Sequence, residues 1–279
     1  MKSKLNKLIV KDIYGNGNYQ KCKKSDLIFD FEDDTEIFCT DWQLGHEDVK
    51  TEALKRLATW TFEKPHRYII LQDFLDDQWL SKFAHLSYGS NEEEEELKQL
   101  NIQLEILKPI YHRFIFQIGS NHWMRRFGLH LSPERSQRAR TQFNIIYGKI
   151  YEANSNFKQY YSTECIVNFK FRSLPNLKMA FIHPSRLGSA STVINRATNY
   201  YGCYGLVVGH THDNIDKTIQ SAIGNKLHVW FSSHLFKDQP EYEKERMATF
   251  SSSEPLILGW HKNVLTGDTE FGNENISSS

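Results

Sequence analysis

The chain has 279 residues, of which 39% are hydrophobic and 24% are charged, and its formal net charge is zero. This length allows one large hydrophobic core or two small ones. The balanced charge excludes a general electrostatic attraction to nucleic acid or to an anionic membrane, so any contact with phosphate must be local.

No apolar run approaches the roughly 20 residues that a membrane-spanning helix needs, and the N-terminus lacks the apolar core of a secretory signal. We therefore expect no membrane partner. The chain has four widely separated cysteines without a Cys-x-x-Cys pair, namely Cys22, Cys39, Cys165 and Cys203. They are typical of reduced thiols in a cytoplasmic protein, and their spacing disfavours a zinc site made of cysteines.

Composition divides the chain into three segments. Residues 1–26 are rich in Lys, Asn and Gly and predict an irregular lead-in, whereas residues 267–279 predict a polar, frayed tail. Between them, residues 27–266 alternate short apolar runs with amphipathic stretches, which predicts a single α/β domain. Strands are predicted at residues 37–40, 67–73, 113–121, 178–184, 205–212 and 226–234. Helices are predicted at residues 47–62, 91–108, 124–151 with a break near Pro133, and 188–200.

Five of these strands are followed by side chains of the kinds that bind metal ions. A single histidine at a strand end is more often structural, but the ordered set indicates one site, because sites in open α/β sheets form beyond the carboxyl ends of strands. Carboxylate, imidazole and amide oxygen suit Mn²⁺, Fe²⁺ or Zn²⁺, and one carboxylate can bridge two ions. The set comprises Asp41 and Gln43, then Asp73, then Asn121 and His122, then His183, then His210 and His212.

The same residues stand in motifs that resemble those of the calcineurin-like metallophosphoesterases. The motifs are DWQ at 41–43, QDFLD at 72–76, SNHW at 120–123, IHP at 182–184 and GHTH at 209–212. The resemblance extends over residues 37–235, and the segments SSHLF at 232–236 and PEYEKE at 240–245 are similar to the phage and bacterial branch of the family. No Gly-x-Ser-x-Gly elbow and no Gly-x-x-x-x-Gly-Lys phosphate loop occurs, which disfavours a serine hydrolase and a P-loop protein.

The resemblance implies a four-layer α/β sandwich, in which a core of two sheets is flanked by helices. It also implies two divalent metal ions, with Mn²⁺ as the first candidate and Fe, Zn²⁺ or Mg²⁺ as alternatives. His122 would lie beside the scissile phosphate, where it would donate a proton or steady charge. The implied metal ligands are Asp41 and His212 for one ion, Asn121, His183 and His210 for the other, and Asp73 as the bridge.

Three positions depart from the family pattern. Gln43 stands where the family usually has histidine, so His46 is an alternative ligand. Gln72 replaces a glycine, which we expect to narrow the approach of the backbone to the site. Trp123 replaces the acid that normally orients the histidine before it, so we expect His122 to have another partner, such as Asp76.

Two further residues at the Asp41 motif have expected roles. Gly45 is expected to let the backbone pass close to the site, and Trp42 is expected to serve in packing rather than in stacking on substrate.

The expected function is hydrolysis of a phosphate ester by in-line attack of a hydroxide that bridges the two metals. The substrate would be a phosphorylated small molecule, a nucleotide or a nucleic-acid end, and a monoesterase and a phosphodiesterase or nuclease both remain open. Arg125 and Arg126 are candidates for gripping the phosphate. Together with Arg135, Arg138 and Arg140 they also fit the simpler interpretation of a solvated helix face. The alternative function is a non-catalytic binding module that keeps the fold without its metals.

Overall fold

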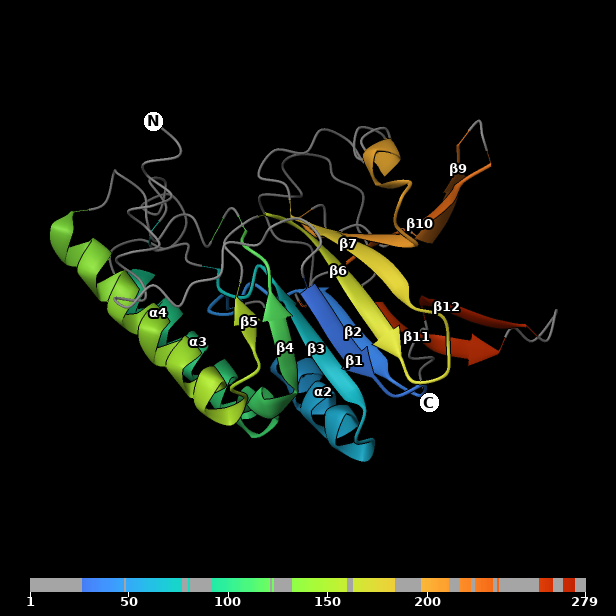
Figure 1. Ribbon diagram of the computed structural model, residues 1–279. Coiled ribbons are helices and arrows are strands. Elements are labelled where there is room, and N and C mark those ends of the chain that lie inside the picture. Colours follow the sequence, from blue (N-terminus) through green and yellow to red (C-terminus); the bar gives the residue numbers. More distant parts are fainter. Residues whose placement is uncertain are drawn as a thin grey trace.

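The protein was analysed as a computed structural model that describes residues 27–47, 49–76, 80, 92–120, 122, 132–159, 163–183, 197–210, 216–221, 224–232, 235, 256–262 and 268–273. These residues form two mixed six-stranded sheets flanked by helices, which confirms the predicted fold class (Figure 1). The first sheet has the strand order β1 (Leu27–Phe31), β6 (Glu164–Phe171), β7 (Leu177–Ile182), β8 (Gly205–Val208), β10 (Lys226–Phe231) and β9 (Asp216–Gln220). The second sheet has the order β12 (Thr269–Asn273), β11 (Leu256–Lys262), β2 (Glu36–Asp41), β3 (Arg67–Gln72), β4 (Phe114–Gln117) and β5 (Lys158–Gln159).

Each sheet contains a block of parallel strands. Strands β2, β3, β4 and β5 run parallel in the second sheet, and strands β7, β8 and β10 run parallel in the first. Parallel strands present their carboxyl ends at one edge of a sheet, so polar residues that follow neighbouring strands are brought together. The two blocks include all five strands that precede the candidate ligands.

The main core lies between the sheets. Alternation along β2 turns Ile37 and Cys39 toward the first sheet, where they join Phe169 and Phe181 in one buried cluster. The rings of Phe116 and Phe181 meet edge to face across the sheets with centroids 5.1 Å apart. Burial raises the pKa of the Cys39 thiol, and the described cysteines Cys39, Cys165 and Cys203 are all buried and free.

Helices cover the outer face of the second sheet (Figure 1). Helices α2 (Thr51–Glu63), α3 (Glu92–Leu107) and α4 (Pro133–Ala153) turn Leu54, Leu104 and Phe143 into a second cluster against Phe38 and Leu71. The outer face of the first sheet packs against a segment that contains the short helix η6 (Thr198–Tyr200). No helix among the described residues is both long enough and apolar enough to cross a membrane.

The helix boundaries differ from the sequence prediction in instructive ways. Helix α2 begins at Thr51 rather than at residue 47, because backbone hydrogen bonds hold the preceding residues in a loop, including one from Lys50 N–H to Leu235 O at 2.8 Å. The break predicted near Pro133 is the start of α4, with Pro133 in the first turn and the Ser132 side chain accepting from Arg135 N–H at 3.3 Å. Of the helix predicted at 188–200, residues 188–196 lie outside the described part of the chain.

The C-terminal segment contains a strand that composition did not indicate. Residues 269–273, which we assigned to a frayed polar tail, pair antiparallel with β11 as strand β12. Phe271 is 1% exposed and joins the core between the sheets, and its carbonyl accepts a hydrogen bond from the Tyr204 hydroxyl at 2.8 Å. One buried aromatic therefore holds an otherwise polar edge strand, and the prediction of fraying is wrong for these residues. The lead-in at residues 1–26 lies outside the described residues.

Candidate metal centre

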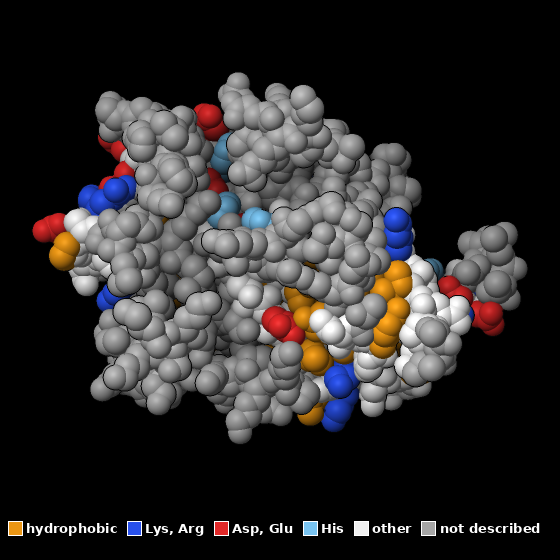
Figure 2. All heavy atoms as spheres, turned by 90° about the horizontal axis from the view of Figure 1, so that it is seen from above, with side chains coloured by type: hydrophobic (Ala, Val, Ile, Leu, Met, Phe, Trp, Pro, Cys, Tyr) orange, Lys and Arg blue, Asp and Glu red, His pale blue; other side chains and the backbone are white. Residues whose placement is uncertain are grey.

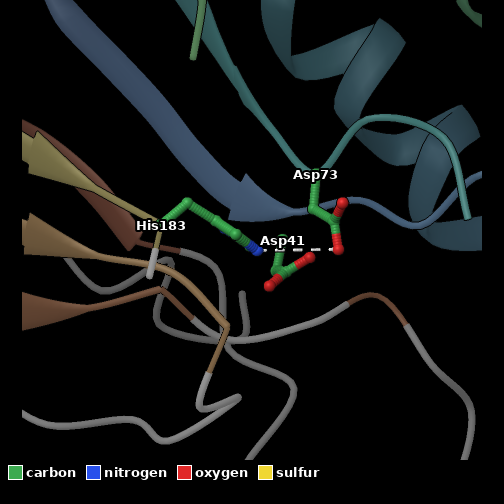
Figure 3. A group of neighbouring side chains, drawn as sticks. All are labelled: Asp41, Asp73 and His183. Atoms are coloured by element: carbon green, nitrogen blue, oxygen red, sulfur yellow. Dashed lines mark ion pairs between the residues drawn. The ribbon is translucent and has the colours of Figure 1, made fainter. Parts of the chain in front are cut away.

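Asp41, Asp73 and His183 converge from the two sheets. Asp41 ends β2, Asp73 follows β3, His183 follows β7, and all three side chains are fully buried. One ligand atom from each lies within 4.8 Å of the other two, and Figure 3 shows the three side chains pointing into the same small volume. Two buried carboxylates this close repel each other, so a cation between them would be strongly favoured.

Hydrogen bonds tie this group to the neighbouring strand β8. Asp41 Oδ2 accepts from the backbone N–H of His210 at 2.9 Å, and Gly209 N–H donates to Ile182 O at 2.9 Å. His183 Nε2 lies 3.7 Å from Asp73 Oδ2, the contact dashed in Figure 3. Ligand candidates from the first sheet are therefore held against those from the second.

The backbone is strained at three candidate site residues. Gln43, Asp73 and His210 have φ values of 44°, 42° and 79°, and they are the non-glycine residues with positive φ in the described part of the chain. Such a conformation costs about 1–3 kcal/mol per residue and persists where the surrounding structure enforces it, most often at functional sites. Here the β2–β3 ladder continues beyond the strands and enforces it, with Gln43 N–H donating to Asp73 O at 2.8 Å.

Gln43, and not His46, lies at this centre. The Gln43 side chain is 3% exposed, and its Nε2 donates to Asp73 Oδ2 at 3.3 Å. The next turn is tied to α3 instead, because Gly45 N–H donates to Gln103 Oε1 at 2.7 Å and Gln103 Nε2 donates to His46 O at 3.0 Å. His46 is half-buried and does not belong to the group of ligand atoms around Asp73 that the described residues form.

The expectation for Gly45 is wrong and that for Trp42 is confirmed. Gly45 has φ +104°, and a Cβ there would lie 3.0 Å from Glu96 Cγ, so the close approach is to α3 rather than to the site. Glu96, from the run of glutamates in the first turns of α3, is 4% exposed and lies against this turn. Trp42 is fully buried among Phe38 and Phe74, so it serves in packing.

The contribution of Gln43 can be separated from that of His46. If the Gln43 amide supports the metal centre, then Gln43→Ala should weaken Mn²⁺ binding by about 10- to 100-fold, as loss of a group that holds a ligand does. His46→Ala should bind Mn²⁺ as the wild type does. Isothermal titration of both variants measures this, and a loss of affinity in His46→Ala with none in Gln43→Ala would reverse the assignment.

His122 contacts Asp76, the partner expected because Trp123 replaces the acid that normally orients this histidine. Its Nδ1 lies 3.1 Å from Asp76 Oδ1 and 3.3 Å from Asp73 Oδ2. Asp76 is 3% exposed, and its backbone N–H donates to Leu44 O at 2.9 Å, so its position is fixed by the extended β2–β3 ladder. The predicted pairing of His122 with Asp76 is confirmed as an ion-pair contact, which is charged when His122 is protonated.

Several candidates cannot be placed. Asn121, Trp123, Arg125, Arg126 and His212 lie outside the described residues, as does most of the segment 232–245 that resembles the phage and bacterial branch. Of the other arginines, Arg138 on α4 is exposed and pairs with Glu93 of α3 at 3.0 Å, in keeping with a solvated helix face.

The three ligand candidates lie at the end of the molecule at which these strands terminate. A view from above shows histidine side chains near the middle of that face (Figure 2). The His210 ring lies beside the His183 ring, with centroids 5.4 Å apart. An imidazole-rich centre with a carboxylate at its middle is suited to bind divalent cations and, through them, an anionic group.

Comparison with solved structures gives remote neighbours. No family model and no curated protein matches the sequence. Vacuolar protein sorting 29 from Cryptosporidium parvum is 11% identical with a TM-score of 0.38, covering 88% of this chain and 100% of the other. Vps29 complexed with Zn²⁺ from Entamoeba histolytica is 10% identical with a TM-score of 0.38, covering 86% and 99%. A conserved uncharacterized protein, a predicted phosphoesterase, from Streptococcus pneumoniae is 7% identical with a TM-score of 0.34, covering 86% and 98%. At these scores the fold assignment rests on the two sheets themselves.

Proposed function

We propose that the chain is a metal-dependent phosphoesterase that acts as the resemblance to calcineurin-like metallophosphoesterases implies. The observation that carries the proposal is the buried convergence of Asp41, Asp73 and His183 from opposite sheets, within 4.8 Å of one another. Buried carboxylates that are not neutralised are costly, and nothing in the packing of a core requires two of them to face an imidazole.

The donor set fits divalent metal ions. Asp73 is the centre of the group, since its Oδ2 lies 3.3 Å from Gln43 Nε2, 3.3 Å from His122 Nδ1 and 3.7 Å from His183 Nε2. This position suits a bridging ligand, with ligand atoms of Asp41 and His183 within 4.8 Å of a carboxylate oxygen of Asp73. Two ions bound here would lower the pKa of a bound water and neutralise charge on a phosphoryl group, and the mixture of oxygen and imidazole donors favours Mn²⁺.

The remaining roles are part of the proposal. His122 would protonate the leaving group of the ester, and Asp76, 3.1 Å from His122 Nδ1, would orient the ring in place of the acid that Trp123 replaces. Arg125 and Arg126 follow His122 in the sequence and would bind the phosphate of a nucleotide or a nucleic-acid end. Phosphate monoesters and phosphate diesters are both candidate substrates.

One observation favours the second candidate, a binding module without catalysis. Gln43 Nε2 donates to Asp73 Oδ2, so the amide occupies one lone pair of the carboxylate that would bridge the metals. Coordination by Gln43 Oε1 requires the amide to turn over. A protein that keeps this hydrogen bond would lack Gln43 as a metal ligand, which would weaken the second metal site that hydrolysis requires.

Metal removal distinguishes the two candidates. Protein stripped with a chelator should lose phosphoesterase activity on chromogenic mono- and diesters, and it should unfold at a lower temperature. An ion at 100 times its Kd stabilises the folded state by about 2.7 kcal/mol, which is several degrees in a calorimetric scan. Returning Mn²⁺ should restore both properties at two ions per chain. Stabilisation at one ion per chain without hydrolysis would favour the binding module, and no thermal response to Mn²⁺, Zn²⁺ or Mg²⁺ would exclude a metal centre.

A further inference from the structure

The two ring nitrogens of His183 face different surroundings. Nε2 points into the centre, 3.7 Å from Asp73 Oδ2. Nδ1 lies on the opposite edge of the ring against Gly209 of the neighbouring chain segment, where a Cβ would come within 2.5 Å of it. The residue is fully buried, so water does not reach the ring. A metal ion on Nε2 would place the ring proton on Nδ1, which then needs an acceptor.

Gln72 brings an amide to the same point. It is the last residue of β3, and strand alternation turns it to the face of Ile70, which looks into the core between the sheets. A Cβ on Gly209 would lie 2.4 Å from Gln72 Oε1, so Gln72 and His183 share the space that this glycine leaves. The prediction that Gln72 narrows the backbone approach before Asp73 stays a prediction, and the structure adds that its side chain lies against Gly209.

The Gln72 amide is a buried polar group that the rest of the described structure does not satisfy. Its side chain is fully buried, and neither Oε1 nor Nε2 has a hydrogen-bond partner among the described residues. Leaving such a group unpaired costs about 1–3 kcal/mol. The unpaired acceptor Gln72 Oε1 lies beside Nδ1 of His183, a candidate metal ligand. This position indicates that Gln72 Oε1 serves as an acceptor for His183 when metal is bound.

We propose that Gln72 is a positioning residue for His183. In the metal-loaded protein, His183 Nδ1–H donates a hydrogen bond to Gln72 Oε1, which holds the ring in the tautomer and orientation that direct Nε2 to the metal. The arrangement also requires glycine at position 209, because any side chain there would push the Gln72 amide and the His183 ring apart. The inference rests on the proposed function only in requiring that the centre binds metal. It does not depend on catalysis.

Gln72→Met tests the proposal, because methionine keeps the length and bulk of the side chain and removes the strong acceptor. It should weaken Zn²⁺ and Mn²⁺ binding in titration calorimetry by about 10- to 100-fold, the usual effect of losing such a partner. In the Zn²⁺-loaded protein with nitrogen-labelled histidine, the His183 Nδ1–H signal should show the chemical shift of a hydrogen-bonded proton in the wild type and lose that shift in Gln72→Met. Gln72→Glu, which restores an acceptor, should recover both properties.

Matched controls separate positioning from general damage. Gln159→Met removes another buried glutamine from the same sheet and should leave metal affinity unchanged. Gly209→Ala should weaken binding as Gln72→Met does, whereas Gly148→Ala, where a Cβ meets nothing within 4 Å, should not. An unchanged His183 Nδ1–H signal in Gln72→Met would overturn the proposal even if metal affinity fell. If the wild-type protein bound no metal, that result would refute both the proposed function and this inference.

Discussion

Asp73→Asn is expected to reduce the affinity for both metal ions by more than about 100-fold. This is a larger effect than the 10- to 100-fold loss of affinity that follows removal of a residue supporting a ligand. The reason is the central place of the Asp73 carboxylate, which lies within 3.7 Å of polar atoms of Gln43, His122 and His183. Asparagine keeps the shape and tolerates the left-handed backbone at φ 42°, so the substitution removes charge and leaves the turn intact. Phosphoesterase activity should be lost with the metals.

The stability of the metal-free protein should move in the opposite direction. Asp41 and Asp73 are both fully buried and repel each other without a cation, so neutralising one of them should raise the unfolding temperature of the stripped protein while abolishing the increase on adding Mn²⁺. Metal analysis per chain and calorimetry measure the two effects.

Asp41→Asn and Asp30→Asn are the controls. Asp41→Asn should lose mainly one ion, and Asp30→Asn, on an exposed position of β1, should lose none. An Asp73→Asn protein with two bound ions and normal turnover would refute the bridging role.

His122→Ala is expected to slow turnover by about 10²–10⁴-fold, the usual contribution of a positioned proton donor. Both metals should remain bound, because the resemblance places His122 beside the phosphate and not among the ligands. Its Nδ1 lies 3.1 Å from Asp76 Oδ1, so Asp76→Asn should misorient the ring and produce a smaller loss of the same kind. Steady-state kinetics with metal content measured on the same samples check both variants.

Leaving groups provide the internal control for proton donation. Nitrophenolate leaves without a proton, whereas an alkoxide does not, so His122→Ala should lose less activity on a nitrophenyl ester than on an alkyl ester. Asp76→Asn should show the same preference. Equal losses on both esters, or loss of metal from His122→Ala, would assign His122 to charge stabilisation or to coordination instead of proton donation.

The confirmed predictions of secondary structure are those that depend on residues close together in the sequence. The apolar runs before Asp41, Asp73, His183 and His210 are strands β2, β3, β7 and β8 in the structure. Strands β1, β5, β6, β9, β11 and β12 were not predicted. In β6 the charged ends and the alternation of buried with half-buried residues obscure the apolar pattern, and β9 and β12 are edge strands with mostly exposed side chains.

The amino-acid sequence by itself determined the chemistry available at the centre, because ligand types and their order after apolar runs are local properties of the chain. It also made the pairing of His122 with Asp76 predictable, since a missing acid beside one residue and an extra acid near Asp73 are both visible in the sequence. Only the tertiary structure decided how these groups meet. The left-handed backbone at Gln43, Asp73 and His210, the burial of Glu96 beneath Gly45, and the meeting of Gln72 with His183 over Gly209 each arise between segments far apart in the chain. Their physical cause is the packing of two sheets and a helix layer, which fixes side-chain directions that no local pattern contains.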